Sequence, residues 1–193
     1  MRFVILGLLL GGPLSLYDLH KHFTGGISLF YAASFGSIQR ALKQVHADGW
    51  ATVEELQGSR RRKKLYAVTE LGREKWREWM MAPPTGSDAE SILLAKVYLL
   101  GRLPANERTR CLAVLRARMR EDAHALEALA ASLDSTEVPR GLREIYRYQR
   151  ATLDYGIRSH SLALEWLDEL QHDRHELSPA EAAAGSSRAR NDR

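Results

Sequence analysis

Apolar residues recur at helical spacing through the first 50 residues of the chain. An uncharged run at residues 3–10 predicts a buried first helix. A second helix should begin after Ser15, whose hydroxyl can cap free backbone N–H groups while Asp18 completes a capping box. A third is predicted from Ser34 to just before Gly49, since its apolar residues follow the i, i+3, i+4, i+7 rule: Ile38, Ala41, Leu42 and Val45.

Two runs suited to β-strands follow the third helix. Residues 52–56 and 63–68 are separated by a short turn-forming segment with a basic tip, which predicts a hairpin. A fourth helix is predicted to start at Thr69 and to carry Trp76 and Trp79. Three helices, a hairpin and a helix, in that order, are typical of a winged helix-turn-helix.

A proline-rich break at residues 82–87 separates this part from a helical second half. Residues 92–100 are apolar on all sides, which predicts a core helix, and longer helices are expected from Pro104 to about Leu133 and from Pro139 to about Leu170. We therefore expect a mainly α fold with a small β-hairpin. The expected parts are a winged helix-turn-helix domain (1–81), a linker (82–87), a helical C-terminal domain (88–175) and a disordered tail (176–193).

The two long helices carry broad apolar stripes, partly at heptad spacing. Pairing with each other would cover part of these stripes. A second subunit would cover the rest, and helix-turn-helix proteins commonly read twofold-related half-sites, so we predict a homodimer. The predicted interface residues are Leu112, Leu115, Met119, Leu126, Leu142, Ile145, Leu162 and Trp166.

Composition places the chain with globular proteins: 45% of its 193 residues are apolar and 27% are charged. No apolar run approaches the ~18 residues of a membrane span, and residues 3–10 lack the cleavage signature of a secretory signal. The single cysteine, Cys111, cannot form an intramolecular disulfide. We therefore expect a cytoplasmic protein associated with the nucleoid and with no membrane partner.

The basic residues are concentrated in the first part of the chain. Residues 1–81 carry 12 Lys and Arg against 7 Asp and Glu, and five of the cations are adjacent at residues 60–64. Adjacent cations repel one another unless an anionic partner neutralises them, which favours contact with the DNA backbone. A basic loop that improves solubility, or a patch for RNA or anionic membranes, is the alternative.

The third helix has a polar and basic face opposite its apolar stripe. Such a helix can enter the major groove, where arginine pairs with guanine and glutamine with adenine, while lysine contacts phosphate. A solvated face that contacts nothing is the alternative interpretation. The predicted DNA-binding residues of this helix and the hairpin are Ser37, Gln39, Arg40, Lys43, Gln44, Arg60, Arg61, Arg62, Lys63 and Lys64.

Several short segments together resemble the PadR-like family of transcriptional regulators. Residues 64–72 are similar to the family's second wing strand and the start of its fourth helix; residues 36–38 with 41–42 resemble its recognition helix; and residues 5–9, 12–14 and 17–19 resemble its first two helices. The resemblance implies a DNA-binding regulator, commonly a repressor, from the longer subgroup with a virulence-activator-like helical dimerisation domain. Gln39 and Arg40 stand where the family usually has tyrosine and proline, so base preference is expected to differ.

Relatives of this architecture can sense small molecules, including phenolic acids, whose binding releases DNA. The candidate effector-binding residues are Trp76, Trp79, Tyr148 and Tyr155, with arginines nearby in the sequence. Packing of these aromatics in the core and in an interface is the simpler interpretation.

The sequence has no G-x-S-x-G elbow, no phosphate-binding glycine loop and no HExxH motif, and its seven histidines lack zinc spacing. We predict no enzyme activity, no catalytic residue, no cofactor and no metal. Cys111 lies near the start of an arginine-rich helix, where its pKa could fall, and a redox role is left open. Two other functions remain open: a non-specific architectural DNA-binding protein and a winged-helix protein-interaction module.

Overall fold

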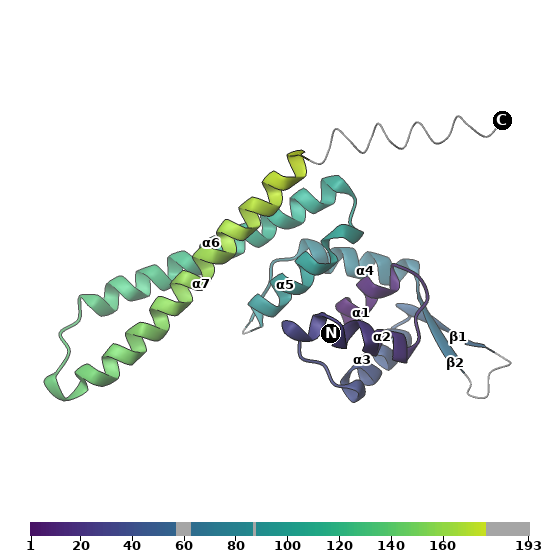
Figure 1. Cartoon of the computed structure of the whole chain (residues 1–193), viewed down its shortest axis with the longest axis horizontal. Helices are drawn as coiled ribbons and strands as arrows, with labels where there is room; N and C mark the ends of the chain where they lie inside the picture. The colour runs from purple at the N-terminus through teal and green to yellow at the C-terminus, as the bar shows by residue number, and fades with distance from the viewer. Residues whose placement is uncertain (57–62, 87, 177–193) are drawn as a thin grey trace. The chain divides into compact units, whose positions relative to one another are not determined.

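The computed structural model describes residues 1–56, 63–86 and 88–176, so the tip of the hairpin and the predicted tail from residue 177 lie outside the described residues. The chain forms two compact units, Met1–Cys111 and the part from Leu112 onward. The first unit contains, in order, α1 (Arg2–Leu9), α2 (Leu16–Thr24), η1 (Ile27–Leu29), α3 (Phe35–Ala47), β1 (Ala51–Leu56), β2 (Lys63–Val68), α4 (Glu70–Met81), α5 (Ala89–Leu99), η2 (Leu100–Arg102) and the start of α6 (Ala105–Asp134) (Figure 1). This order confirms the mainly helical fold with a small hairpin that was predicted.

Reciprocal hydrogen bonds fix the start of two helices. The Ser15 hydroxyl accepts from the Asp18 backbone N–H (3.2 Å), and the Asp18 carboxylate accepts from the Ser15 N–H (3.0 Å), which completes the predicted capping box of α2. Ser34 and Ser37 cap α3 in the same way. These bonds satisfy backbone donors that have no partner within the helix.

The hairpin, which we call the wing, joins directly to α4. Its strands are antiparallel, from Ala51 opposite Val68 to Leu56 opposite Lys63. Thr69 caps α4 by accepting a hydrogen bond from the Gly72 N–H (3.1 Å), as predicted. Position 72 has to be glycine, because a Cβ there would lie 2.1 Å from the Trp50 carbonyl oxygen. The close approach of α4 to the backbone just before β1 therefore depends on this residue.

The core of the first unit forms around α1. Residues 4–9 are all buried, and α1 contacts α3, α4 and α5. The buried stripe predicted for α3 is confirmed, since Ile38, Leu42 and Val45 are at most 1% exposed. The opposite face of α3 is therefore turned toward solvent.

The second unit consists of the rest of α6, the 3-10 turn η3 (Arg140–Leu142) and α7 (Arg143–Glu176). The last helix was predicted to start at Pro139. The backbone of Pro139 is instead extended, and the Leu142 N–H donates to the Pro139 carbonyl in the η3 turn. The helix α7 therefore begins later, at Arg143. Within the described residues, no helix is both long and apolar enough to cross a membrane.

The helices α6 and α7 run antiparallel and pair along their length (Figure 1). Arg150 forms an ion pair with Asp134 beside the turn (2.8 Å), and Arg116 forms one with Asp168 toward the other end (2.5 Å). Leu167 is fully buried. One face of α7 is thus covered by α6.

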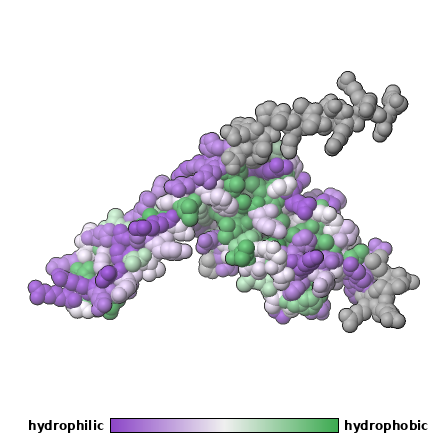
Figure 2. Space-filling view, viewed as in Figure 1, coloured by the Kyte–Doolittle hydropathy of each residue, from purple (hydrophilic) through white to green (hydrophobic). Residues whose placement is uncertain are grey.

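A second apolar face of α7 is exposed. Ile145, Tyr148, Tyr155 and Leu162 are 56–73% exposed. The last three are seven residues apart and Ile145 lies three residues before Tyr148, spacings that place all four on one side of the helix. In Figure 2, apolar surfaces interrupt the otherwise hydrophilic surface of the α6–α7 pair. We call these four residues the α7 stripe.

Candidate nucleic-acid interface

The solvent-facing side of α3 carries most of the predicted base-reading residues. Gln39, Arg40 and Lys43 are exposed. The Arg40 guanidinium lies over Gly36, with Nη1 3.6 Å from the point that a Gly36 Cβ would occupy. Gln44 is exposed too, but its amide donates to the Asp48 carboxylate (2.6 Å). Three long polar side chains are thus exposed on the same helix, α3.

Ser37 is placed differently from the other predicted residues. Its hydroxyl accepts from the Ser34 N–H (2.9 Å) and donates to the Ser34 carbonyl (2.8 Å). A contact with a base or phosphate would compete with these capping bonds. The structure therefore gives Ser37 a role in starting α3.

The wing brings two of the predicted cations beside acidic side chains. Lys63 Nζ lies 3.6 Å from Asp18 Oδ2, and Lys64 Nζ lies 2.9 Å from Glu55 Oε1 across the hairpin. The side chains of these ion pairs are about half exposed, so each pair contributes little to stability. Each lysine can therefore exchange its carboxylate partner for a phosphate. The predicted contacts at Arg60, Arg61 and Arg62 lie outside the described residues.

Two contacts hold the wing against the start of α2. The backbone of Leu14 pairs with that of Tyr66 in β2 through two hydrogen bonds (3.0 and 2.9 Å). Hydrogen bonds from Ser15 hold the pKa of Asp18 below its ordinary value, and the nearby Lys63 ammonium lowers it further. The carboxylate is therefore charged at neutral pH and ties α2 to β2.

Two exposed aromatic residues of this region were not predicted. Phe35, the first residue of α3, is 47% exposed, and its ring meets His20 edge-on at 5.3 Å. Tyr17 in α2 is 71% exposed. Phe35 lies three residues before Ile38, at the edge of the buried face of α3, and an aromatic residue at a helix start beside a polar face was the signal that could have identified it.

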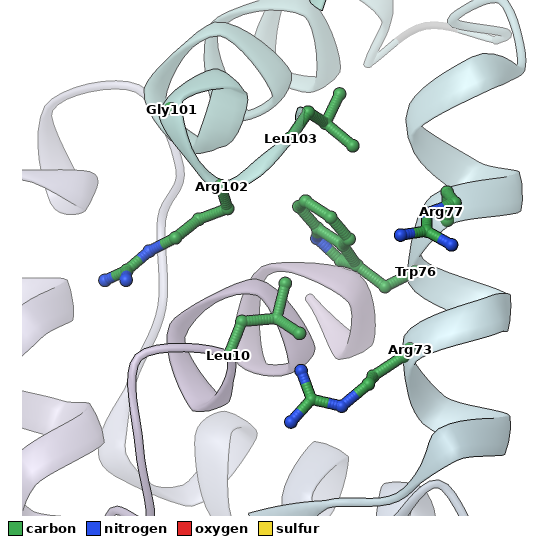
Figure 3. A pocket seen from close by; sticks show the side chains of 7 residues that line it. All are labelled: Leu10, Arg73, Trp76, Arg77, Gly101, Arg102 and Leu103. Atoms are coloured by element: carbon green, nitrogen blue, oxygen red, sulfur yellow. The ribbon is translucent and has the colours of Figure 1, made fainter. Parts of the chain in front are cut away.

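A cavity of about 330 Å³ lies between the end of α1, α4 and η2 (Figure 3). Leu10, Trp76 and Leu103 form its apolar part, and Arg73, Arg77, Gly101 and Arg102 complete the lining. Trp76 is 3% exposed, and its indole N–H has no hydrogen-bond partner among the described residues. The cavity is thus lined by both apolar side chains and guanidinium groups.

Of the four predicted effector-binding residues, only Trp76 lines this cavity. Trp79 stacks parallel to Phe3 at 5.3 Å. Tyr148 and Tyr155 belong to the second unit, where they are part of the exposed α7 stripe. The structure therefore does not bring the four aromatics together within either unit.

A buried lysine lies behind α4. Lys96 is 1% exposed, its ammonium donates to the Ala82 carbonyl at the end of α4, and Nζ lies 5.1 Å from the Trp79 ring centroid. Burial lowers the pKa of Lys96 to about 8. This residue was not predicted, although the sequence places a lysine inside the apolar run of residues 92–100.

Cys111 lies near the same place. The sequence suggested that its pKa could fall at a helix start, but this was wrong: Cys111 is fully buried, and burial raises the pKa of its thiol. The Sγ–H donates to the Met80 carbonyl (3.2 Å). Its position is that of an inert packed thiol. No group of three or more His, Cys, Asp or Glu in the described residues is placed to hold a metal ion.

The predicted interface residues divide into three groups. Leu112, Leu115 and Met119 are at most 4% exposed within a single chain. They therefore have almost no accessible surface that a second subunit could cover. Leu126 and Trp166 are half-buried. Leu142, Ile145 and Leu162 are more than 50% exposed. The surface available to a partner is thus at the start of the last helical segment and along α7.

Comparison with known protein families identifies both parts of the chain. The model described as the transcriptional regulator PadR-like family matches residues 5–78, from α1 to most of α4. The model described as the virulence activator alpha C-term matches residues 91–172, from α5 to most of α7. The chain thus combines a PadR-like domain with a virulence-activator C-terminal domain. The resemblance seen in the sequence is confirmed, and the PadR-like family consists of transcriptional regulators, not enzymes.

Individual relatives of this PadR-like chain are distant. It is 28% identical over 109 residues to the negative transcriptional regulator PadR of Bacillus subtilis, a match that covers 55% of the chain and 60% of the relative, less than two-thirds of its length. It is 28% identical over 174 residues to a probable transcriptional regulator of Mycobacterium tuberculosis, covering 80% and 86% of the two chains. The crystal structure of Bacillus subtilis PadR with operator DNA is 22% identical, covers 88% of this chain and 94% of that chain, and has a TM-score of 0.42.

Proposed function

We propose that this PadR-like protein is a sequence-specific repressor of transcription that binds double-stranded DNA with α3 and the wing. The observation that carries the proposal is the outer face of α3, where Gln39, Arg40 and Lys43 are exposed together and no carboxylate lies among them. The wing cations are held in the same unit by the contacts of β2 with Leu14 and Asp18. One surface thus offers groups for base edges and groups for phosphates.

The two parts of this surface have different roles in the proposal. Arg40 and Gln39 read guanine and adenine in the major groove, since their planar donor groups match those base edges. The wing cations neutralise phosphates, and each neutralised phosphate releases counterions. Lys63 and Lys64 exchange their partly exposed carboxylate partners for phosphates on binding.

The protein acts as a homodimer on a pseudo-palindromic operator in this proposal. The support is the α7 stripe, which leaves four large side chains in water although the other face of α7 is packed on α6. Pairing of two α7 stripes removes this apolar surface from water. A twofold dimer presents two α3 helices to two half-sites.

A small aromatic acid bound in the Trp76 cavity releases the DNA. The cavity volume of about 330 Å³ suits a small molecule, the indole of Trp76 offers an aromatic surface, and Arg73 and Arg77 offer a counter-charge for a carboxylate. Both arginines already have acidic partners, Glu70 and Glu107, which a ligand would have to displace. Because α4 continues directly from β2, a ligand that shifts α4 also shifts the wing.

A repressor of transcription acts on chromosomal DNA. We therefore also propose that the protein is cytoplasmic.

A footprint tests the proposal. Duplexes that bind the full-length chain are selected from a random library and probed by hydroxyl-radical cleavage. The expected result is two protected half-sites, related by a twofold axis and separated by about 34–36 Å, one turn of B-DNA. Protection that spreads evenly along the duplex, or the absence of any selected sequence, contradicts it.

A non-specific architectural role is the second candidate, and the five adjacent cations at residues 60–64 favour it. This role predicts steep salt dependence with little preference for any sequence. A protein-interaction module, the third function that the sequence left open, predicts no DNA binding even at low salt. In that case, replacing both Arg61 and Lys63 by Ala leaves partner binding intact.

A further inference from the structure

Phe35 occupies an unusual position for an apolar residue. It is the first residue of α3 and is 47% exposed. The side chains that α3 buries are Ile38, Leu42 and Val45, and Phe35 lies outside that group. Packing in the core therefore does not account for the exposed half of the ring.

The other side chains at this end of α3 are committed elsewhere. The hydroxyls of Ser34 and Ser37 cap the helix, and Gly36 has no side chain. Of residues 34–37, Phe35 is thus the one whose side chain is available to a partner at the helix start. The group offered there is apolar, whereas Gln39 and Arg40 offer hydrogen bonds one turn further on.

His20 fixes the direction of the Phe35 ring. The two ring centroids are 5.3 Å apart with an interplanar angle of 62°, an edge-on packing between α2 and α3. A ring already held in one orientation loses less conformational freedom when it meets a ligand than a freely rotating one. The exposed part of Phe35 is therefore a preorganised apolar contact.

One group in the major groove matches such a contact. Each base pair shows hydrogen-bond donors and acceptors there, and thymine adds a 5-methyl group that apolar side chains recognise. The N-terminal residues of the recognition helix are those that reach base edges. We propose that Phe35 contacts a thymine 5-methyl group in the operator and is a specificity-determining residue. This inference rests on the proposed DNA-binding function.

The position of Gln39 locates that thymine. Residues four apart on a helix are neighbours, with Cβ atoms about 5–6 Å apart. Successive base pairs are about 3.4 Å apart along the duplex. The thymine contacted by Phe35 therefore lies within about two base pairs of the adenine that Gln39 reads.

Deoxyuridine, which lacks the methyl group but keeps the Watson–Crick edge of thymine, provides the test. In a duplex selected with the full-length chain, each thymine is replaced singly by deoxyuridine, and binding is measured by fluorescence anisotropy. The wild-type chain should lose about fourfold in affinity at one position, the size expected for one methyl group removed from water. The Phe35→Ala chain should bind the thymine and deoxyuridine duplexes equally at that position. Phe35→Leu should keep part of the difference.

Two comparisons separate this role from a structural one. Leu71→Ala removes an apolar side chain of similar exposure, 43%, from α4 and should keep the full loss with deoxyuridine. The inference is overturned if Phe35→Ala and Phe35→Leu lower the affinities for the thymine and deoxyuridine duplexes by the same factor, so that both variants keep the wild-type difference between the two duplexes. In that case the ring only supports the packing of α2 on α3. Specific binding with no thymine sensitive to deoxyuridine also overturns the inference but leaves the proposed function standing. Failure to select any specific duplex contradicts both.

Discussion

Lys63 Nζ lies 3.6 Å from the carboxylate of Asp18, the residue that completes the capping box of α2. One carboxylate therefore stabilises a helix start and contacts the first residue of β2. The two residues are far apart in the sequence, so this contact helps to place the wing relative to the helix-turn-helix. When DNA binds, Lys63 can leave Asp18 for a phosphate while Ser15 still holds the carboxylate.

Asp18→Asn should lower the free energy of unfolding by about 1 kcal/mol at pH 7, as expected for a weakened cap. The pKa of Asp18 is depressed in the folded chain, so the charged carboxylate stabilises the fold above the ordinary value of 3.8. This stabilisation is lost as pH falls through the lowered pKa. Urea unfolding of wild type and variant should differ at pH 7 and converge at low pH. If the difference in the free energy of unfolding between wild type and variant stays the same at every pH, the charge of Asp18 is irrelevant to stability. Glu54→Gln, which changes another carboxylate to an amide, is the control.

Arg40→Ala should relax sequence preference, because it removes the side chain that we propose pairs with guanine. Arg61→Ala should weaken binding to all duplexes alike and reduce the slope of log affinity against log salt by about 1, since it removes a proposed phosphate contact. Anisotropy titrations against a selected and a scrambled duplex at several salt concentrations measure both effects. The same effect from both variants would contradict the division of roles between α3 and the wing.

Lys96→Met should remove a pH dependence of stability. The pKa of Lys96 is lowered from 10.5 to about 8, so between these values the folded chain binds fewer protons than the unfolded chain and stability rises with pH. From pH 7 to pH 9 the gain is roughly 1 kcal/mol in the wild type. The variant should lack this gain in denaturant unfolding at pH 7, 8 and 9. Measurement stops at pH 9 because Cys111, whose pKa is raised, acts in the opposite direction at higher pH.

Leu162→Glu should convert the proposed dimer to a monomer, because it places a charge within the α7 stripe, where Leu162 is 66% exposed. Ser161→Glu adds the same side chain at the adjacent exposed position, off the stripe, and should remain dimeric. Sedimentation velocity distinguishes the two states. A wild-type monomer, or a Leu162→Glu dimer as stable as the wild type, would contradict the proposed interface.

The helix starts and the buried face of α3 could be predicted because their causes are local. A Ser or Thr cap and a residue three positions later are enough to define the start of α2, α3 or α4. The stripe of Ile38, Leu42 and Val45 follows from helical period alone. Pro139 was misjudged because a proline can precede a 3-10 turn as readily as an α-helix, and the choice depends on how the chain turns back toward α6.

The remaining features depend on contacts between distant residues. The partner of Lys63 is in α2, and that of Lys96 is at the end of α4, and no spacing rule connects either pair. The stripes of α6 and α7 look alike in the sequence, yet Leu112 is buried within one chain while Leu162 is exposed. Period indicates which residues share a face, but it does not indicate what covers that face. The candidate effector residues are divided between the two units, Trp76 and Trp79 in the first and Tyr148 and Tyr155 in the second, and periodicity cannot indicate such a division.

The ratio of two affinities tests whether this protein binds DNA sequence-specifically. The full-length chain is titrated against a selected operator and a scrambled duplex of equal length by fluorescence anisotropy at near-physiological salt. A sequence-specific repressor should bind the operator more tightly by about 10³-fold or more, within the range of specific DNA-binding proteins. Equal affinities for the two duplexes, or no binding to either, would contradict it.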